Sequence, residues 1–276
     1  MPDRTWLDAV ARLRAARQPG VLVTVAAVRG HAPRAAGAKL VVSAHRTWGS
    51  IGGGNLEAAA IDRARQMLTD QEAGPELTES ALSDKVPHQG GVQCCGGTVT
   101  VLLEPLPVVP AVAIFGVGHV GLELARILAR QDIDLHLIDT RPEQLADDRL
   151  AVLSDAVARV RVHRPVVLPE TVLGDLPADA HVLIMTHDHA EDLALCDAVL
   201  RGGSFGSVGL IGSAGKWARF RRKLAGELGH DAEAIARIKT PIGLPGIAGK
   251  EPATIAVSVA ADLLAALERT RAAVRR

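Results

Sequence analysis

Residues 111–128, which read AVAIFGVGHVGLELARIL, contain the sharpest structural signal of the chain. An apolar run is followed by Gly116, Gly118 and Gly121 at the start of a helical pattern, and Asp139 ends the next apolar run. This spacing is typical of a dinucleotide-binding unit, because the glycines allow a tight turn and bring backbone N–H groups close to a phosphate. It predicts a phosphate site at the helix N-terminus, with Asp139 binding a pair of ribose hydroxyls. The same fold with a changed ligand is the alternative.

Outward from this unit, short apolar runs alternate with helical patterns. Strands are expected at 111–115, 135–138, 182–185 and 207–211, and helices at 119–130, 189–202 and 215–228. This alternation predicts a Rossmann-like, doubly wound parallel sheet over 111–276. A last helix begins at Pro252. Its apolar stripe, which we expect to pack against the first domain or another subunit, consists of Ile255, Val259, Leu263 and Leu267.

The N-terminal part predicts a mixed α/β domain over 1–107. Helices are expected at 5–17 and 55–68, and strands at 21–28, 39–43, 47–51 and 98–103. The polar residues 69–90 indicate a long connection or an irregular strand. Pro105, Pro107 and Pro110 indicate a linker, and we place the domain boundary there.

Composition excludes several functional classes. The 276 residues include 31 Lys and Arg against 31 Asp and Glu, and only 2% are aromatic. This balance argues against binding to nucleic acid or to an anionic membrane. Three cysteines, two of them adjacent, make no disulfide framework, and no run is long and apolar enough for a membrane span or a secretory signal. We therefore expect a cytoplasmic protein.

A second glycine turn, Gly52-Gly53-Gly54, separates a strand from a helix in the first domain. Successive glycine N–H groups before a helix can bind an anion. Asn55 is the expected helix cap, and Glu57 places a carboxylate in the first turn. The alternative is a tight structural turn without a ligand.

Two adjacent cysteines, Cys94 and Cys95, precede Gly96 and Gly97. Such thiols can react or bind a soft metal or a sulfur-bearing ligand, and inert buried thiols are the alternative. Cys95 is the stronger candidate, because the glycines after it let a ligand approach closely. No second Cys or His pair has the spacing of a structural zinc site.

Two further segments follow strands of the second domain. His187 and His189 come after the strand 182–185, at the edge where a ligand crevice forms. We expect no metal there, because further histidines at ligand spacing are missing.

A third glycine turn precedes Lys216, and the helix that it opens carries four more cations: Arg219, Arg221, Arg222 and Lys223. This cluster indicates a site for phosphate or an acidic partner, with a solvated helix face as the alternative.

Together these motifs resemble the xanthine dehydrogenase accessory protein (XdhC) family, relatives of the CoxI-type accessory factors of carbon monoxide dehydrogenase. The similar segments are GSIGGGNLE (49–57), QCCGG (93–97), FGVGHVG (115–121), IDTRPE (138–143), MTHDHAEDL (185–193), IGSAGKWARFRRKL (211–224) and PIGLPGIAGKEPATIAVSVAADLL (241–264). The resemblance implies a chaperone rather than an enzyme. Such a protein holds the molybdenum cofactor, a molybdopterin, while its sulfido ligand is installed, and passes it to apo-xanthine dehydrogenase.

The implied partners are the molybdenum subunit of xanthine dehydrogenase and a cysteine desulfurase. We expect the cofactor to be bound by Gly52, Gly53, Gly54, Asn55, Glu57, Cys95, Gly116, Gly118, Gly121, Asp139, His187 and Lys216. Because ligand sites favour domain interfaces, we expect Gly52–Gly54 and Cys95 to face residues 116–121 across one cleft. This cleft would lie within one chain or across a homodimer.

An NAD(P)-dependent oxidoreductase is the alternative from another class. Gly116, Gly118, Gly121 and Asp139 would then hold the dinucleotide, and His187 or His189 would act as general acid. The chain has no Tyr, which removes a Tyr–Lys proton relay. A nucleotide-sensing or scaffolding protein is the third hypothesis.

Overall fold

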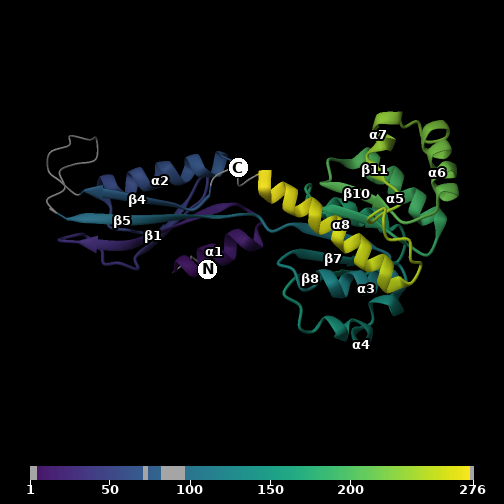
Figure 1. The fold of residues 1–276 in the computed structure, drawn as a ribbon, viewed down its shortest axis with the longest axis horizontal. Coiled ribbons are helices and arrows are strands. Elements are labelled where there is room, and N and C mark those ends of the chain that lie inside the picture. The colour runs from purple at the N-terminus through teal and green to yellow at the C-terminus, as the bar shows by residue number, and fades with distance from the viewer. Residues whose placement is uncertain (1–4, 71–73, 82–96, 274–276) are drawn as a thin grey trace. The chain divides into compact units, whose positions relative to one another are not determined.

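The structure of the chain is a computed structural model that describes residues 5–70, 74–81 and 97–273, with side chains described as far as residue 268. The chain divides into two compact units, Met1–Val108 together with Arg269–Arg276, and Val109–Glu268. Each unit has its own sheet (Figure 1). Within the described residues, no helix combines the length and the apolar character that a membrane span requires.

The first unit is an antiparallel sheet with a helix on each face (Figure 1). Its strands lie in the order β3-β2-β1-β5-β4. The strand bounds are Gly20–Arg29 for β1, Lys39–Val42 for β2, Thr47–Gly49 for β3, Glu76–Ala81 for β4 and Thr98–Leu106 for β5. The helices are α1, Trp6–Ala15, and α2, Gly54–Thr69. This confirms the predicted mixed α/β class.

Alternation along β1 explains why both faces of this sheet are covered. Val21, Val23 and Val25 are buried in one core with the apolar face of α2. The intervening Leu22 packs in a second core with Ala9 of α1. Side chains of a strand point to opposite faces in turn, so one strand supplies both cores. The apolar positions predicted for α2 are all buried: Leu56, Ala60, Ala64 and Met67.

The expected proline linker is shorter than predicted. β5 continues to Leu106, and Pro105 pairs with Val21 of β1. Proline is tolerated there because β4 pairs with β5 only from Thr98 to Leu103, so the other side of Pro105 needs no N–H donor. Within the polar segment 69–90, residues 76–81 form the edge strand β4.

The second unit is a parallel sheet with the strand order β11-β10-β9-β6-β7-β8. The bounds are Ala111–Phe115 for β6, Asp134–Ile138 for β7, Arg159–His163 for β8, His181–Ile184 for β9, Ser207–Leu210 for β10 and Ile238–Lys239 for β11. The order reverses at β6, as in a Rossmann fold. β8 and β11 escaped prediction because β8 alternates charged and apolar residues and β11 has only two residues.

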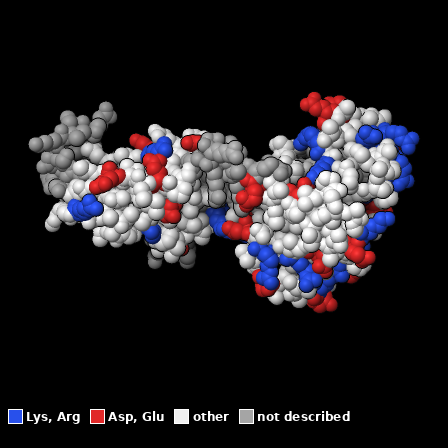
Figure 2. All heavy atoms as spheres, viewed as in Figure 1, with Lys and Arg blue, Asp and Glu red and all other residues white. Residues whose placement is uncertain are grey.

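Helices cover both faces of this parallel sheet, which confirms the doubly wound fold. On one face pack α3, His119–Leu128, and α8, Pro252–Ala273. On the other face pack α5, His189–Gly202, and α6, Ala214–Gly226. Shorter segments complete the unit: η1 Pro142–Leu145, α4 Asp147–Leu150, η2 Ala151–Leu153, η3 Pro169–Asp175 and α7 Ala232–Ala236. Figure 2 shows Lys and Arg side chains gathered over α6.

The last helix packs differently from the prediction. Val259, Leu263 and Leu267 are buried in the same core as Leu124 of α3 and Leu135 of β7, and Ile255 packs against that core. The apolar stripe therefore completes the Rossmann core of its own unit. The expectation that the stripe packs against the first domain or another subunit is wrong. α3 covers only part of one face of the parallel sheet, and α8 covers the rest of that face.

Candidate functional site

The site centres on the glycine turn between β6 and α3. α3 covers one face of the sheet and α5, which follows the neighbouring strand β9, covers the other. The carboxyl ends of β6 and β9 therefore border the crevice in which ligands of doubly wound sheets bind. Gly116 has a φ of +101°, and a Cβ there would overlap the carbonyl oxygen of Met185. A Cβ at Gly121 would overlap the carbonyl oxygen of Gly116. These two glycines are required by packing of the chain itself.

Gly118 differs from the other two glycines of the turn. A Cβ there would meet no atom closer than Nη2 of Arg141, at 3.8 Å. Gly118 is also the N-cap of α3, and no side chain caps this helix. By contrast, α5 and α6 are capped by the side chains of Asp188 and Ser213. The first turn of α3 therefore offers backbone N–H groups, open space and the positive end of a helix dipole to an anion.

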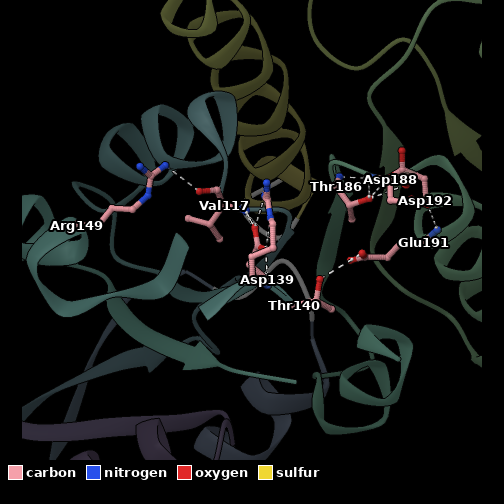
Figure 3. Close-up of polar contacts among 9 residues, drawn as sticks. Val117, Asp139, Thr140, Arg149, Thr186, Asp188, Glu191 and Asp192 are labelled. Atoms are coloured by element: carbon pink, nitrogen blue, oxygen red, sulfur yellow. Dashed lines mark hydrogen bonds and ion pairs between the residues drawn. The ribbon is translucent and has the colours of Figure 1, made fainter. Parts of the chain in front are cut away.

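Asp139 lies beside this turn and is almost completely buried. Its Oδ2 accepts a hydrogen bond from the Val117 N–H at 2.8 Å (Figure 3). The same oxygen accepts a second bond from Nη2 of Arg141 at 2.9 Å. Its Oδ1 accepts from the N–H (3.0 Å) and Nε (2.9 Å) of Arg141. Burial raises the pKa of Asp139, but the hydrogen bonds from Arg141 and Val117 outweigh it and hold the pKa below its ordinary value.

These contacts bear on the ribose role predicted for Asp139. A carboxylate has about four lone-pair positions, and the bonds from Val117 and Arg141 use four. A ribose diol would have to displace Arg141 before it could bind Asp139. Sequence reasoning missed Arg141, although its position two residues after the fingerprint acid was the available signal.

Glu191 faces the carboxyl end of β7 from the first turn of α5. The hydroxyl of Thr140 donates a hydrogen bond to its Oε2 at 3.3 Å (Figure 3). Burial raises the pKa of the Glu191 carboxyl above its ordinary value, although the nearby His187 and the Thr140 hydrogen bond oppose this. A carboxyl with a raised pKa in a crevice is suited to exchange protons with a ligand.

Lys216 is engaged within the protein. Its Nζ forms an ion pair with the fully buried Asp192 and donates to the carbonyl oxygen of Ile211 at 2.8 Å. Asp192 also accepts from the N–H (3.0 Å) and the hydroxyl (2.8 Å) of Thr186. The pair thus joins the residues that follow β9 and β10 to α5 and α6. Its charge is neutralised, so a phosphate would compete with Asp192 for Lys216.

The two histidines of the predicted crevice edge are both exposed. His189 begins α5, and its ring meets the edge of Phe220 with the centroids 6.3 Å apart. In the described part of the chain, no group of three His, Cys, Asp or Glu side chains is placed to hold a metal ion.

The second predicted anion site, Gly52–Gly54, contains a carboxylate of the chain. Oε2 of Glu57 accepts from the hydroxyl of Ser50 (2.6 Å) and from the N–H groups of Ile51 (2.9 Å) and Gly53 (3.1 Å). Burial raises the pKa of Glu57, but the hydrogen bonds from Ser50 and the backbone outweigh it and lower the pKa. An anionic ligand would have to displace Glu57 from this turn.

The role expected for Asn55 as helix cap is wrong. The N-cap of α2 is Gly53, and Asn55 lies inside the first turn. The turn needs φ values of +128°, +72° and +65° at Gly52, Gly53 and Gly54, so the helix begins where the glycine run still continues. The expectation that Glu57 lies in the first turn is confirmed.

Comparison with known proteins places the chain in a family. Residues 112–263 match the XdhC Rossmann domain, and residues 13–79 match the XdhC and CoxI family. The chain belongs to the XdhC and CoxI family.

Two proteins illustrate how far this XdhC-family chain resembles others. It is 28% identical over 254 residues to the uncharacterized protein YqeB of Escherichia coli (strain K12). The matched region covers 92% of this chain and 44% of YqeB. The chain therefore spans less than half the length of that relative. It also resembles a crystal structure described as a xanthine dehydrogenase from Bacillus halodurans, with 20% identity and a TM-score of 0.47, over 95% of this chain and 96% of that one.

The cysteine pair of this XdhC-family chain, Cys94 and Cys95, lies outside the described residues. Gly97 is described, and a Cβ there would overlap the carbonyl oxygen of His31, so the chain itself needs this glycine. The third cysteine, Cys196, is buried in α5. Burial raises the pKa of Cys196 to about 12, so this thiol stays protonated at neutral pH.

The second unit brings together four predicted residues of the XdhC Rossmann domain, namely Gly116, Gly118, Gly121 and Asp139. Lys216 lies in the same unit, bound to Asp192. Gly52–Gly54 and Glu57 belong to the first unit, and the shared cleft between the two glycine turns stays a prediction.

Proposed function

We propose that this chain is an accessory protein for the maturation of xanthine dehydrogenase, which holds the molybdenum cofactor by its phosphate at the Gly116–Gly121 turn. Family membership supports the role in maturation. One observation carries the choice of turn: the N-terminus of α3 has no capping side chain, whereas the turn at Gly52–Gly54 contains the Glu57 carboxylate. The cofactor is cargo in this proposal, and the chain performs no reaction on it.

The groups at the turn fit a phosphate. N–H donors at the start of α3 suit its oxygens, and the space at Gly118 lets an anion approach the backbone. Arg141 lies within reach of the same space and has donors beyond those that it gives to Asp139. For the sulfur-rich end of the cofactor, Cys95 is our candidate, because Gly96 follows it directly and the third cysteine, Cys196, is buried.

The proposed partners follow from this role. A cysteine desulfurase would supply the sulfur while the cofactor is held, and the molybdenum subunit of xanthine dehydrogenase would receive it. NAD(P) is the second candidate ligand, because the same turn would hold its pyrophosphate and Glu191 could exchange a proton. The contacts of Arg141 with Asp139 weigh against it.

Gly118→Ala tests the assignment of the turn. Gly118 has a φ of −69°, which alanine adopts, and the added methyl group meets no protein atom closer than 3.8 Å. It does enter the space of the phosphate, so we expect about tenfold or greater loss of cofactor affinity, equivalent to roughly 1.4 kcal/mol. Pterin and molybdenum are measured in protein produced in cells with an active pterin pathway, and NADH binding is followed by fluorescence.

Gly226→Ala is the matched control, because it adds one methyl group at the end of α6 with no atom within 4 Å. It should retain cofactor like the parent. A parent protein that carries neither pterin nor molybdenum and cannot retain added cofactor would end the proposal. NADH binding that is lost in Gly118→Ala, without any pterin in the parent, would favour the oxidoreductase.

A further inference from the structure

A groove of about 440 Å³ lies between α5 and α6. Its lining includes His189, Leu193 and Asp197 of α5, Arg219 and Lys223 of α6, and Leu228. Along α5 the lining runs from His189 to Asp197, which is about 12 Å at the rise of an α-helix, or roughly two helical turns.

The floor of this groove is apolar. Phe220 belongs to the core between the sheet and the two helices, and Leu193 and Leu228 are partly buried against it. An apolar floor between two helices is typical of a groove that receives the apolar face of an amphipathic segment. A free phosphate or a nucleic acid backbone would gain little from such a floor.

The α6 side of the groove is positively charged. α6 contains no Asp or Glu, and its two exposed cations that line the groove, Arg219 and Lys223, form no ion pair with any described residue. By contrast, Arg126 of α3 pairs with Glu123 at 3.0 Å, and Arg201 of α5 pairs with Asp197 at 2.8 Å.

The acid that lines the groove is already engaged. Asp197 accepts hydrogen bonds from Arg201 at 2.8 Å and from Nε2 of His230 at 2.6 Å. Arg219 and Lys223 are therefore like charges one helical turn apart, an arrangement that destabilises a helix by about 0.2–0.5 kcal/mol. Carboxylates from a partner would offset this repulsion.

We infer that the groove between α5 and α6 binds an acidic amphipathic helical segment of the molybdenum subunit to which the cofactor is delivered. The inference rests on the proposed function and names the surface that this partner uses. Apolar residues of the segment pack on the partly exposed Leu193 and Leu228, and its carboxylates pair with Arg219 and Lys223. His189, at one end of the groove, is two residues before Glu191, which accepts a hydrogen bond from Thr140 beside Asp139, so this end of the groove is the one nearer the crevice.

Charge reversal tests the groove. Arg219→Glu with Lys223→Glu, the rim variant, reverses the charge of the α6 side, whereas Arg126→Glu with Arg130→Glu makes the same charge change at the same spacing elsewhere on the unit. Affinity for the purified apo molybdenum subunit is measured at low and high salt, and pterin retention is measured separately. We expect the rim variant to bind the subunit at least tenfold more weakly, the control to bind within about twofold of the parent, and both to retain pterin. The parent should bind more weakly at high salt.

Three outcomes would overturn the inference. Equal subunit affinity of the rim variant and the parent would remove the groove and leave the proposed function intact. Tighter binding of short single-stranded DNA than of the subunit, lost in the rim variant, would assign α6 to nucleic acid. A parent that retains pterin but does not bind the subunit would remove the docking surface, whereas a parent without pterin contradicts the proposed function itself. Circular dichroism spectra of both variants should match the parent, which excludes unfolding as the cause.

Discussion

Asp192 and Lys216 form an ion pair that is almost completely shielded from water. Every polar contact of the pair is internal: Thr186 donates to Asp192, and Lys216 donates to the carbonyl oxygen of Ile211. A buried charge is tolerated only when its partner and its hydrogen bonds are in place. These residues therefore hold the ends of β9 and β10 beside the crevice.

Lys216→Met should strongly destabilise the second unit, by about 3–5 kcal/mol, because it leaves the Asp192 carboxylate buried without its cation. Combining Lys216→Met with Asp192→Asn should recover part of this loss, since no charge then remains buried. Lys223→Met, on an exposed position of the same helix, should change the free energy of unfolding by less than about 0.5 kcal/mol. Urea denaturation of the four proteins measures this. A Lys216→Met variant as stable as the parent would contradict the role assigned to the pair.

At the scale of single residues, the sequence predicted where the glycine turns lie but not which groups occupy them. The need for glycine at 116 and 121 followed from the fingerprint. The sequence did not predict that Glu57 fills the Gly52–Gly54 turn. An acid in the first turn of a helix can equally point away from the turn, and the sequence does not distinguish the two directions. The contact between Arg141 and Asp139 was also missed, since side-chain direction is set by tertiary packing.

At the scale of elements, α8 separates what periodicity can predict from what it cannot. The spacing of Val259, Leu263 and Leu267 correctly identified the buried face of the helix. The spacing does not tell which part of the protein packs on that face. In the structure this is the part of one face of the parallel sheet that α3 leaves uncovered. Short or half-exposed strands such as β8 and β11 were missed for a related reason: their residues lack a continuous apolar run.

Leu263→Ala tests whether α8 is part of the Rossmann core. The side chain is 5% exposed and packs in the core that contains Leu124 and Leu135, so its truncation should cost about 2–5 kcal/mol. Val257→Ala, on the exposed side of the same helix, should cost less than about 0.5 kcal/mol. Chemical denaturation followed by circular dichroism measures both. Equal stability of the two variants would mean that α8 is not held in this core in solution.

At the scale of the whole molecule, each unit contains complete cores of its own. The first unit buries its residues between one antiparallel sheet, α1 and α2, and the second between one parallel sheet and the helices on its two faces. The four core clusters share no buried residue. Chains with two such units commonly depart from two-state unfolding, because each core can open separately.

A pair of matched core variants tests this independence. Leu103→Ala removes a side chain that is 1% exposed in the first unit, and Leu135→Ala removes a completely buried one in the second. Each should cost its own unit about 2–5 kcal/mol. In hydrogen exchange, Leu103→Ala should lower the protection of β1 and β5 while β6 and β9 keep theirs, and Leu135→Ala should do the reverse. Leu103→Ala should also leave the proposed phosphate site at Gly118 intact, because that turn is built within the second unit. Loss of protection throughout the chain from either substitution would show that the two units unfold together, and the glycine turn of the XdhC Rossmann domain would then depend on the first unit for its stability.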